Sequence, residues 1–220
     1  MYGGRKSLVA DQPIDIQLHT FHSPELRSVV QKAITFFNAT PLHPLPPHRR
    51  FAGVGVYALY YFGDFASYDF LSALNQRQCA QPIYVGKAVP GGSRTGRASP
   101  SERGQNLYGR LREHAGSIAH AENLNVDHFR CRFMLLMDIE TDLIATVEAQ
   151  LIQLYTPLWN TVVAGFGIHN PGKGRFGQAL SEWDILHPGR PWGSQLRGEL
   201  RQLSNIIAKI DQARARLQLP

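Results

Sequence analysis

One acidic residue stands on the apolar side of a predicted helix in the second half of the chain. The segment DLIATVEAQLIQLY surrounds Glu148 with Ile144, Val147, Leu151, Ile152 and Tyr155. A carboxylate in such surroundings loses hydration, which either a cation or an internal arginine must replace. A lone oxygen ligand is typical of Mg²⁺, which keeps several waters and takes further oxygens from a substrate phosphate. Glu148 therefore indicates either a magnesium ligand or a structural salt bridge.

A second pair of residues with useful chemistry lies four positions apart in the segment QNLYGRLREHAGS. At that spacing Arg110 and His114 project from the same face of a helix and can meet one ligand. A guanidinium fork and an imidazole together suit a phosphate group. Such a pair is also common on a solvated helix face, so it does not identify a site by itself.

Two tyrosines lie beside glycines in short apolar segments. Tyr57 ends the triplet GVY, and Tyr84 begins the triplet YVG. Each triplet falls in a predicted strand, and the two strands are expected to pair in antiparallel fashion. Strand tyrosines ordinarily pack in the core or against a neighbouring strand, so neither residue identifies a site when it is considered alone.

Apolar periodicity predicts the elements that position these residues. Strands and helices of this central region are predicted over residues 53–62, 82–89, 106–119, 127–137 and 142–155. Asp142 is expected to cap the last of these helices, and Pro157 is expected to end it.

Further segments flank this region. Ser23 and Pro24 are suited to the start of a helix that should end near Asn38. The proline-rich segment 41–50 can be neither a helix nor a central strand, and a surface linker is expected there. A final helix is predicted over residues 194–217. Its apolar residues recur in steps of four and three, at Leu196, Leu200, Leu203, Ile207, Ile210 and Leu217. This stripe either packs on its own domain or forms a dimer seam.

Composition limits the class of protein but does not identify it. The chain has 220 residues, a net charge of +6 and 43% hydrophobic residues, enough to bury a core. The basic balance, with a sequence pI near 9.5, favours a polyanionic partner. Cys79 and Cys131 lie far apart and form no metal-binding pair, which favours a reduced, cytoplasmic protein. No segment resembles a signal peptide or a membrane span.

Taken in order, the segments GVY, YVGK, GRLREH and VEAQLIQLYTPLWN resemble the GIY-YIG nuclease superfamily over about residues 53–161. That superfamily has a glycine–tyrosine strand, a tyrosine–glycine strand, a helix with a catalytic arginine, a helix with a metal-binding glutamate, and an asparagine after a proline. The resemblance implies an α+β fold, in which a small and mostly antiparallel central sheet is flanked by helices. Valines replace the middle isoleucines of both signature triplets, and the gap from Tyr57 to Tyr84 is longer than usual.

The additions to this core are similar to those of the GIY-YIG type II restriction endonucleases. The similarity divides the chain into an N-terminal arm with a helix and a linker (1–50), a catalytic core (51–178) and a C-terminal helical extension (179–220). Within the core, residues 63–80 and 91–105 are insertions that are expected to contact DNA.

The resemblance implies hydrolysis of a DNA phosphodiester with one divalent ion, Mg²⁺ with Mn²⁺ as a substitute. The expected site consists of Tyr57, Tyr84, Arg110, His114, Glu148 and Asn160. Glu148 would hold the metal, and Arg110 would stabilise charge on the phosphoryl group. Tyr57 would orient and deprotonate the water. A free phenol has a pKa of about 10 and is a poor base near neutral pH, so His114 is either its assistant or the base itself. Tyr84 would hydrogen-bond the phosphate or the water, and Asn160 would brace the site.

Recognition of the DNA sequence is expected from two loops rich in glycine and basic residues, 91–105 and 165–177. Together with Lys87, which adds positive charge near the site, the candidate DNA contacts are Arg94, Arg97, Arg103, His169, Asn170, Lys173 and Arg175. Arginine recognises guanine and asparagine recognises adenine, although any one of these residues can also contact phosphate alone.

Cutting both strands of a symmetric double-stranded site favours a homodimer. A DNA methyltransferase acting on the same site is a conceivable partner that the sequence leaves open. Two other functions also stay open: a structure-selective or nicking repair nuclease, and a DNA-binding module without catalysis. The presence of Tyr57, Arg110, Glu148 and Asn160 argues against the second of these.

Overall fold

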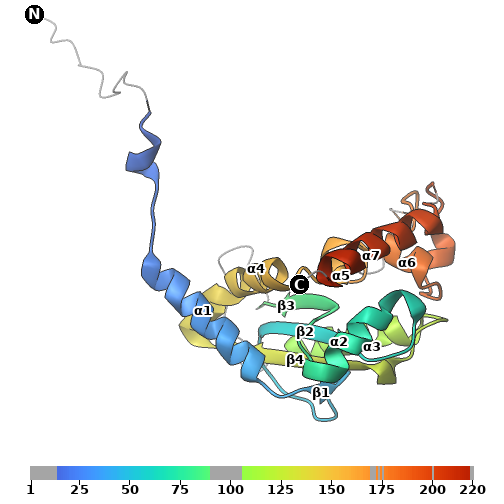
Figure 1. Ribbon diagram of the computed structural model, residues 1–220, viewed down its shortest axis with the longest axis horizontal. Helices are drawn as coiled ribbons and strands as arrows, with labels where there is room; N and C mark the ends of the chain where they lie inside the picture. The colour runs from blue at the N-terminus through green and yellow to red at the C-terminus, as the bar shows by residue number, and fades with distance from the viewer. Residues whose placement is uncertain are drawn as a thin grey trace, which may run out of the picture.

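An antiparallel sheet forms the centre of the molecule (Figure 1). The computed structural model describes residues 14–89, 106–168, 172, 174, 176–199 and 201–218. Within these ranges the strands are β1 (His43–Pro44), β2 (Gly55–Tyr61), β3 (Tyr84–Ala88) and β4 (Phe129–Leu135), in the order β1-β4-β2-β3. Every residue of β2 is buried, as expected for a central strand with helices on both faces. The expected α+β fold is confirmed.

The register of the sheet decides which side chains share a face. Tyr57 on β2 lies opposite Gly86 on β3 and Phe133 on β4. Because successive side chains alternate between faces, Tyr57 and Tyr84 point to one face, whereas Lys87 points to the other. The two signature triplets are therefore antiparallel neighbours, as the sequence predicted.

Helices cover both faces of this sheet. On one face lie α1 (Pro24–Ala39) and α4 (Ile144–Tyr155), which pack against Val56, Ala58, Tyr60, Val85 and Met134. The other face carries α2 (Asp69–Gln78), α3 (Asn106–Ala119), α5 (Leu158–Thr161), α6 (Glu182–Leu186) and α7 (Leu203–Gln218). No helix in the described ranges has the length and apolar character that crossing a bilayer requires.

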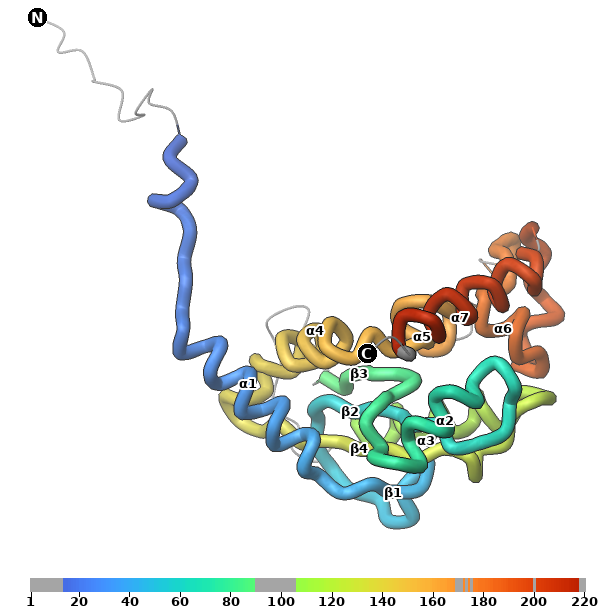
Figure 2. Tube along the Cα trace, in the orientation of Figure 1, coloured from blue at the N-terminus to red at the C-terminus, as the bar shows by residue number. Residues whose placement is uncertain are grey.

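The N-terminal segment stands away from this body. Ser23 caps α1 as predicted, its hydroxyl accepting from the Leu26 amide. Residues 14–23 extend beyond that helix and include a short 3-10 helix, η1 (Ile16–His19), that has no buried residue (Figure 2). The linker 41–50 follows the surface as predicted, except that it supplies the two-residue edge strand β1. Proline is tolerated there because an edge strand needs fewer backbone donors.

The insertion at 63–80 is folded into the body. It forms η2 (Ala66–Tyr68) and α2, and it buries Phe70, Leu71 and Asn75. The Asn75 amide nitrogen donates to the carbonyls of Tyr61 and Gln81, at 3.1 and 2.9 Å, so the side chain ties the insertion to β2.

Two predicted helix starts are wrong. Asp142 does not cap a helix, because it lies inside a 3-10 helix, η5 (Asp138–Leu143), that precedes α4. The final helix begins at Leu203 instead of residue 194, because residues 197 and 198 form backbone hydrogen bonds with residues 176 and 178 instead of continuing a helix. There the amides of Arg197 and Gly198 donate to the carbonyls of Phe176 and Gln178, at 2.9 and 3.1 Å.

The last helix packs on its own domain, one of the two alternatives for its apolar stripe. Ile206 and Ile210 are fully buried in the core on the α3 side of the sheet. Leu203 and Ile207 are 46% and 37% exposed, so the buried face is rotated from the predicted one by about one residue.

Candidate active site

The centre of the site is a contact between β2 and α3. The Tyr57 hydroxyl lies 2.6 Å from Nε2 of His114, and both side chains are buried. Burial, and then the proximity of Tyr84, raise the pKa of the Tyr57 phenol above its usual value, although Arg110 opposes them. Because the phenol stays protonated near neutral pH, its hydroxyl can donate to His114.

Tyr84 completes an aromatic cluster around this contact. Its ring centroid lies 6.3 Å from that of Tyr57 and 5.1 Å from that of His114. Glycines make the close packing feasible: a Cβ on Gly86 would lie 2.5 Å from the Tyr57 hydroxyl, and a Cβ on Gly167 would lie 2.5 Å from the Tyr84 hydroxyl. The glycine of the YVG triplet is thus required for space beside Tyr57.

Arg110 supplies the positive charge on this side of the sheet. It lies one turn before His114 on α3, and its Nη1 is 2.6 Å from Oε2 of Glu113. Burial acts to lower the pKa of Arg110, but Tyr57 and Glu113 outweigh it and raise the value. Burial also raises the pKa of the Tyr84 phenol, and the Arg110 guanidinium opposes the rise at both tyrosines, so its charge acts on both hydroxyls.

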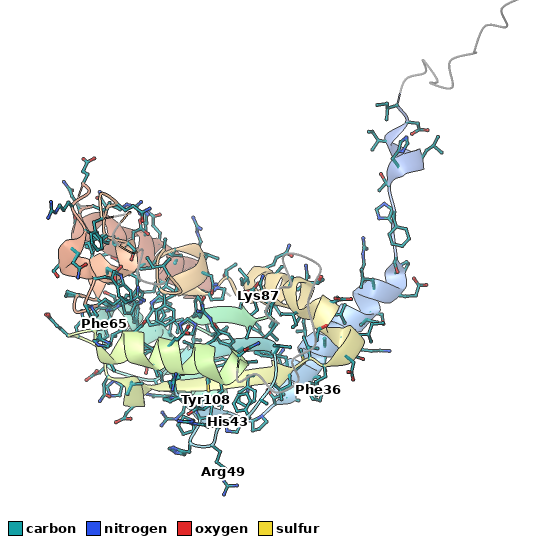
Figure 3. All side chains as sticks on the ribbon, turned by 180° about the vertical axis from the view of Figure 1, so that it is seen from behind. Phe36, His43, Arg49, Phe65, Lys87 and Tyr108 are labelled. Atoms are coloured by element: carbon teal, nitrogen blue, oxygen red, sulfur yellow. The ribbon has the colours of Figure 1, made fainter. Side chains whose placement is uncertain are left out.

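Glu148 reaches the site from the opposite face of β3. On α4 its carboxylate oxygen Oε2 lies 2.5 Å from Nζ of Lys87, and the two side chains are 17% and 38% exposed. Figure 3 has Lys87 beside this helix. Burial is the main cause of the raised pKa of Tyr57 and Tyr84, and the Glu148 carboxylate adds a smaller contribution in the same direction.

Asn160 holds β3 in place between these groups. Its side-chain oxygen accepts from the Val85 amide at 2.8 Å, and its side-chain nitrogen donates to the Val85 carbonyl at 2.9 Å. The amide group thereby acts as one more residue of strand alongside β3, next to Tyr84 and Gly86.

The donor set at Glu148 fits a hard divalent ion. Among the described residues no group of three or more His, Cys, Asp or Glu could hold a metal. A single, partly exposed carboxylate is nevertheless the arrangement by which Mg²⁺ is often held, with waters and phosphate oxygens in the other positions. Such an ion would compete with the Lys87 ammonium for this carboxylate.

Several residues of the site were missed by sequence reasoning. A cavity of about 240 Å³ opens beside Arg110 and His114, and its other walls include Ser117, His120, Phe166, Arg190 and Trp192. Ser117 could have been found from helical spacing, since it lies three positions after His114 and seven after Arg110 on α3. Phe166 and Arg190 had no such signal.

Most of the residues predicted to contact DNA cannot be placed. Lys87 is described, but Arg94, Arg97, Arg103, His169, Asn170, Lys173 and Arg175 lie outside the described residues. All six residues of the expected catalytic set are described. Tyr57, Tyr84, Arg110 and His114 lie on the α3 side of the sheet, Glu148 lies on the α4 side, and Asn160 lies along the edge of β3.

This arrangement agrees with the comparison to known proteins. The model of the Eco29kI GIY-YIG domain, which defines a restriction endonuclease family of the GIY-YIG superfamily, matches residues 49–214. The chain belongs to this family. A comparison with curated protein sequences found no match. The GIY-YIG match contains all six expected site residues, and it continues through α6 into α7. The chain is therefore a nuclease of the restriction-endonuclease type, whose substrate is DNA.

Proposed function

We propose that the chain is a type II site-specific endonuclease, which hydrolyses phosphodiester bonds of double-stranded DNA with a single divalent ion, Mg²⁺ or Mn²⁺. The observation that carries this proposal is the 2.6 Å contact between Tyr57 and His114, flanked by the positive charge of Arg110 and the carboxylate of Glu148. It combines a route for a proton, a partner for a phosphate and a ligand for a metal.

The proton route favours His114 as the final acceptor. Burial makes Tyr57 a weak acid, so the phenol alone is a poor base. If the attacking water gives its proton to the Tyr57 oxygen while the phenolic proton passes to Nε2 of His114, the tyrosine ends neutral. His114 then holds the added proton, the water oxygen forms the new bond to phosphorus, and the bond between phosphorus and the 3′ oxygen breaks, so that the 3′ oxygen leaves with the bonding electron pair.

Charged side chains would bind the metal ion and the phosphate. Glu148 would hold the ion, which supplies Lewis-acid stabilisation of the phosphate and the leaving 3′ oxygen. Arg110 would bind a phosphate oxygen from the α3 side, where its charge already acts on both hydroxyls. Lys87, released from Glu148, would offer its ammonium to the same phosphate. Tyr84 would hydrogen-bond the phosphate or the water.

DNA recognition in this proposal comes from the loops 91–105 and 165–177, with Lys87 at the base of the first. The linker carries two further positively charged residues. Arg49 and Arg50 are exposed, and Figure 3 has Arg49 pointing away from the body. Nearby, Phe51 packs on Tyr108 of α3 with ring centroids 5.7 Å apart, so these arginines lie close to where the 91–105 segment rejoins the fold. Their position suits contacts to DNA phosphates.

Cutting of both strands is assigned to a homodimer. The apolar face of α7 is largely used within its own domain, whereas the N-terminal arm exposes Ile14, Ile16, Leu18 and Phe21, each by 69% or more. An arm with this composition suits contact with a second copy of the chain. A DNA methyltransferase of the same specificity would then be needed to protect the host's own sites.

Plasmid digestion tests the proposed function. Incubation with Mg²⁺ should give discrete fragments whose ends map to one short sequence. Glu148→Gln should abolish cutting but leave DNA binding within about twofold, because the amide keeps the shape of the side chain and loses the charge that holds the ion.

The other outcomes identify the competing functions. Nicks, or cleavage of branched DNA only, would identify a repair nuclease. Binding without any cleavage by the unsubstituted protein would identify a DNA-binding module. Wild-type cleavage by Glu148→Gln would show that the metal has been assigned to the wrong residue.

A further inference from the structure

A buried ion pair lies directly behind the aromatic wall of the site. Arg190 and Asp184 are 4% and 5% exposed, and Nη1 of Arg190 lies 3.3 Å from Oδ1 of Asp184. Burial lowers the pKa of Arg190, and Asp184 opposes this shift. Two buried charges are costly to desolvate, so the pair is a weak source of stability and needs another explanation.

The guanidinium holds the backbone of one short segment. Nη1 of Arg190 donates to the Gly165 carbonyl at 3.0 Å, and Nη2 donates to the Phe166 carbonyl at 2.5 Å. The same segment is tied to α6, because the Trp183 amide donates to the Ala164 carbonyl at 3.0 Å. A planar fork that bonds two successive carbonyls fixes the orientation of the peptide between them.

That segment presents Phe166 to the catalytic cluster. The Phe166 ring is stacked on the His114 ring, with centroids 4.7 Å apart and planes 20° apart. Its edge meets Tyr84 at 4.9 Å. The phenylalanine therefore limits rotation of the imidazole whose Nε2 lies 2.6 Å from the Tyr57 hydroxyl.

We propose that Arg190 is a positioning residue for the nuclease reaction: it anchors the backbone of Phe166, and the Phe166 ring holds His114 in line with Tyr57. This role rests on the proposed function of His114 as the proton acceptor. It makes α6 and the turn after it, in the segment that was predicted to be an extension outside the core, part of the catalytic apparatus.

Two variants interrupt this chain of contacts at different points. Arg190→Lys keeps a positive charge beside Asp184 but lacks the planar fork that bonds both carbonyls, and Phe166→Leu keeps an apolar group but removes the stacked ring. Phe129→Leu is the matched control, because Phe129 is equally buried on the same side of the sheet and contacts Tyr61 and Trp159 instead of His114. Thermal unfolding identifies any variant that does not fold.

The measurement is single-turnover cleavage, with enzyme in excess, of a plasmid fragment that contains one mapped site. Arg190→Lys and Phe166→Leu should each cut at least about tenfold more slowly, because even a small displacement of a catalytic group strongly lowers the rate. Their affinity for the fragment should stay within about twofold, because Arg190 and Phe166 are almost fully buried. Phe129→Leu should cut within about twofold of the wild-type rate, because the Phe129 ring contacts Tyr61 and Trp159 instead of His114.

A double-substitution cycle with His114→Ala decides whether the effect passes through the imidazole. Once the imidazole is absent, Arg190→Lys and Phe166→Leu should lower the remaining rate by less than about twofold. If they lower it as much as before, or if Phe129→Leu is equally slow, the positioning role is wrong while the function of His114 stands. If His114→Ala cuts at the wild-type rate, the proposed role of His114 is itself wrong, and no positioning role remains.

Discussion

At the scale of single residues, the proposed reaction depends on the hydroxyl of Tyr57. Tyr57→Phe removes that hydroxyl and leaves the buried ring in place. The rate of single-turnover cleavage should fall by about 10²- to 10⁴-fold, because proton transfer from the water loses its first acceptor. DNA affinity should change by less than about twofold.

The same strand provides the control for this change. Tyr61 is also buried on β2, faces the same way as Tyr57, and bonds the Phe65 amide at 2.8 Å instead of His114. Tyr61→Phe should therefore cut at close to the wild-type rate. Equal losses in the two variants would mean that the strand as a whole, and not the Tyr57 hydroxyl, controls the reaction.

In the proposed mechanism, Lys87 and the divalent ion compete for the carboxylate of Glu148. In Lys87→Met the 2.5 Å ion pair with Glu148 is lost, and Mg²⁺ or Mn²⁺ should bind the free protein more tightly. A partly exposed ion pair is worth about 1 kcal/mol or less, so the gain should be at most about fivefold. Calorimetric titration measures it directly. Cleavage should nevertheless become slower, since the phosphate loses a cation.

A second lysine–glutamate pair serves as the control. Lys209 on α7 contacts Glu182 on α6, outside the catalytic cluster. Lys209→Met should leave the affinity for the ion unchanged. Weaker binding of the ion by Lys87→Met would contradict the competition and would assign Lys87 a supporting role at the metal.

At the scale of elements, a buried histidine joins four segments. Nε2 of His187 lies 2.6 Å from the Tyr68 hydroxyl and Nδ1 lies 2.8 Å from Oδ1 of Asn123, while Trp159 donates to the same hydroxyl at 2.9 Å. Burial, and then Arg190, lower the pKa of His187 to about 3. The unfolded value is about 6.5, so the stabilisation is complete above that pH and is lost as the pH falls toward the folded value.

Acidification should therefore weaken the fold. Between about pH 6.5 and 4.5 this one group should lower the free energy of unfolding by roughly 1.4 kcal/mol per pH unit at most. Urea unfolding at both pH values measures the change. His187→Gln should show a smaller dependence on pH than the wild type, and the exposed His120→Gln should match the wild type. An unchanged dependence in His187→Gln would exclude His187 as its source.

How far the sequence predicts these elements depends on how local their causes are. The strands of Tyr57 and Tyr84 were predictable because apolar alternation and glycine triplets are local features. The Ser23 cap was also predictable, since its hydroxyl acts on an amide three residues away. The start of α7 was not, because the pairing of Arg197 and Phe176 that displaces it joins residues far apart in the sequence.

The same distinction applies to the site. Glu148, Arg110 and His114 could be singled out from residue type and helical spacing. Phe166 contacts His114, which lies 52 positions earlier in the sequence, and Arg190 acts on Phe166 from another segment again. Nothing in a single sequence marks such contacts, because an aromatic residue between two glycines is equally typical of an ordinary turn.

At the scale of the whole molecule, the N-terminal arm and α7 offer two candidate dimer surfaces. In Ile16→Asp/Phe21→Asp the charges fall on the arm, and in Leu203→Asp/Ile207→Asp they fall on the exposed part of α7. Sedimentation should give a dimer for the wild type and for the α7 variant, and a monomer for the arm variant. The monomer should nick plasmid DNA instead of cutting both strands. A dimeric arm variant would exclude the arm as the interface.

The two hydrogen bonds between Asn160 and Val85 also bear on aggregation of the chain at high concentration. An open edge strand can recruit a strand from another molecule and begin aggregation. On β3 the amide and carbonyl of Val85 are already occupied by the Asn160 side chain, and the Ile83 carbonyl accepts from the Trp159 amide at 2.9 Å. The Asn160 side chain therefore also blocks intermolecular β-pairing at Val85, so protection against aggregation falls on the residue that is proposed to brace the site.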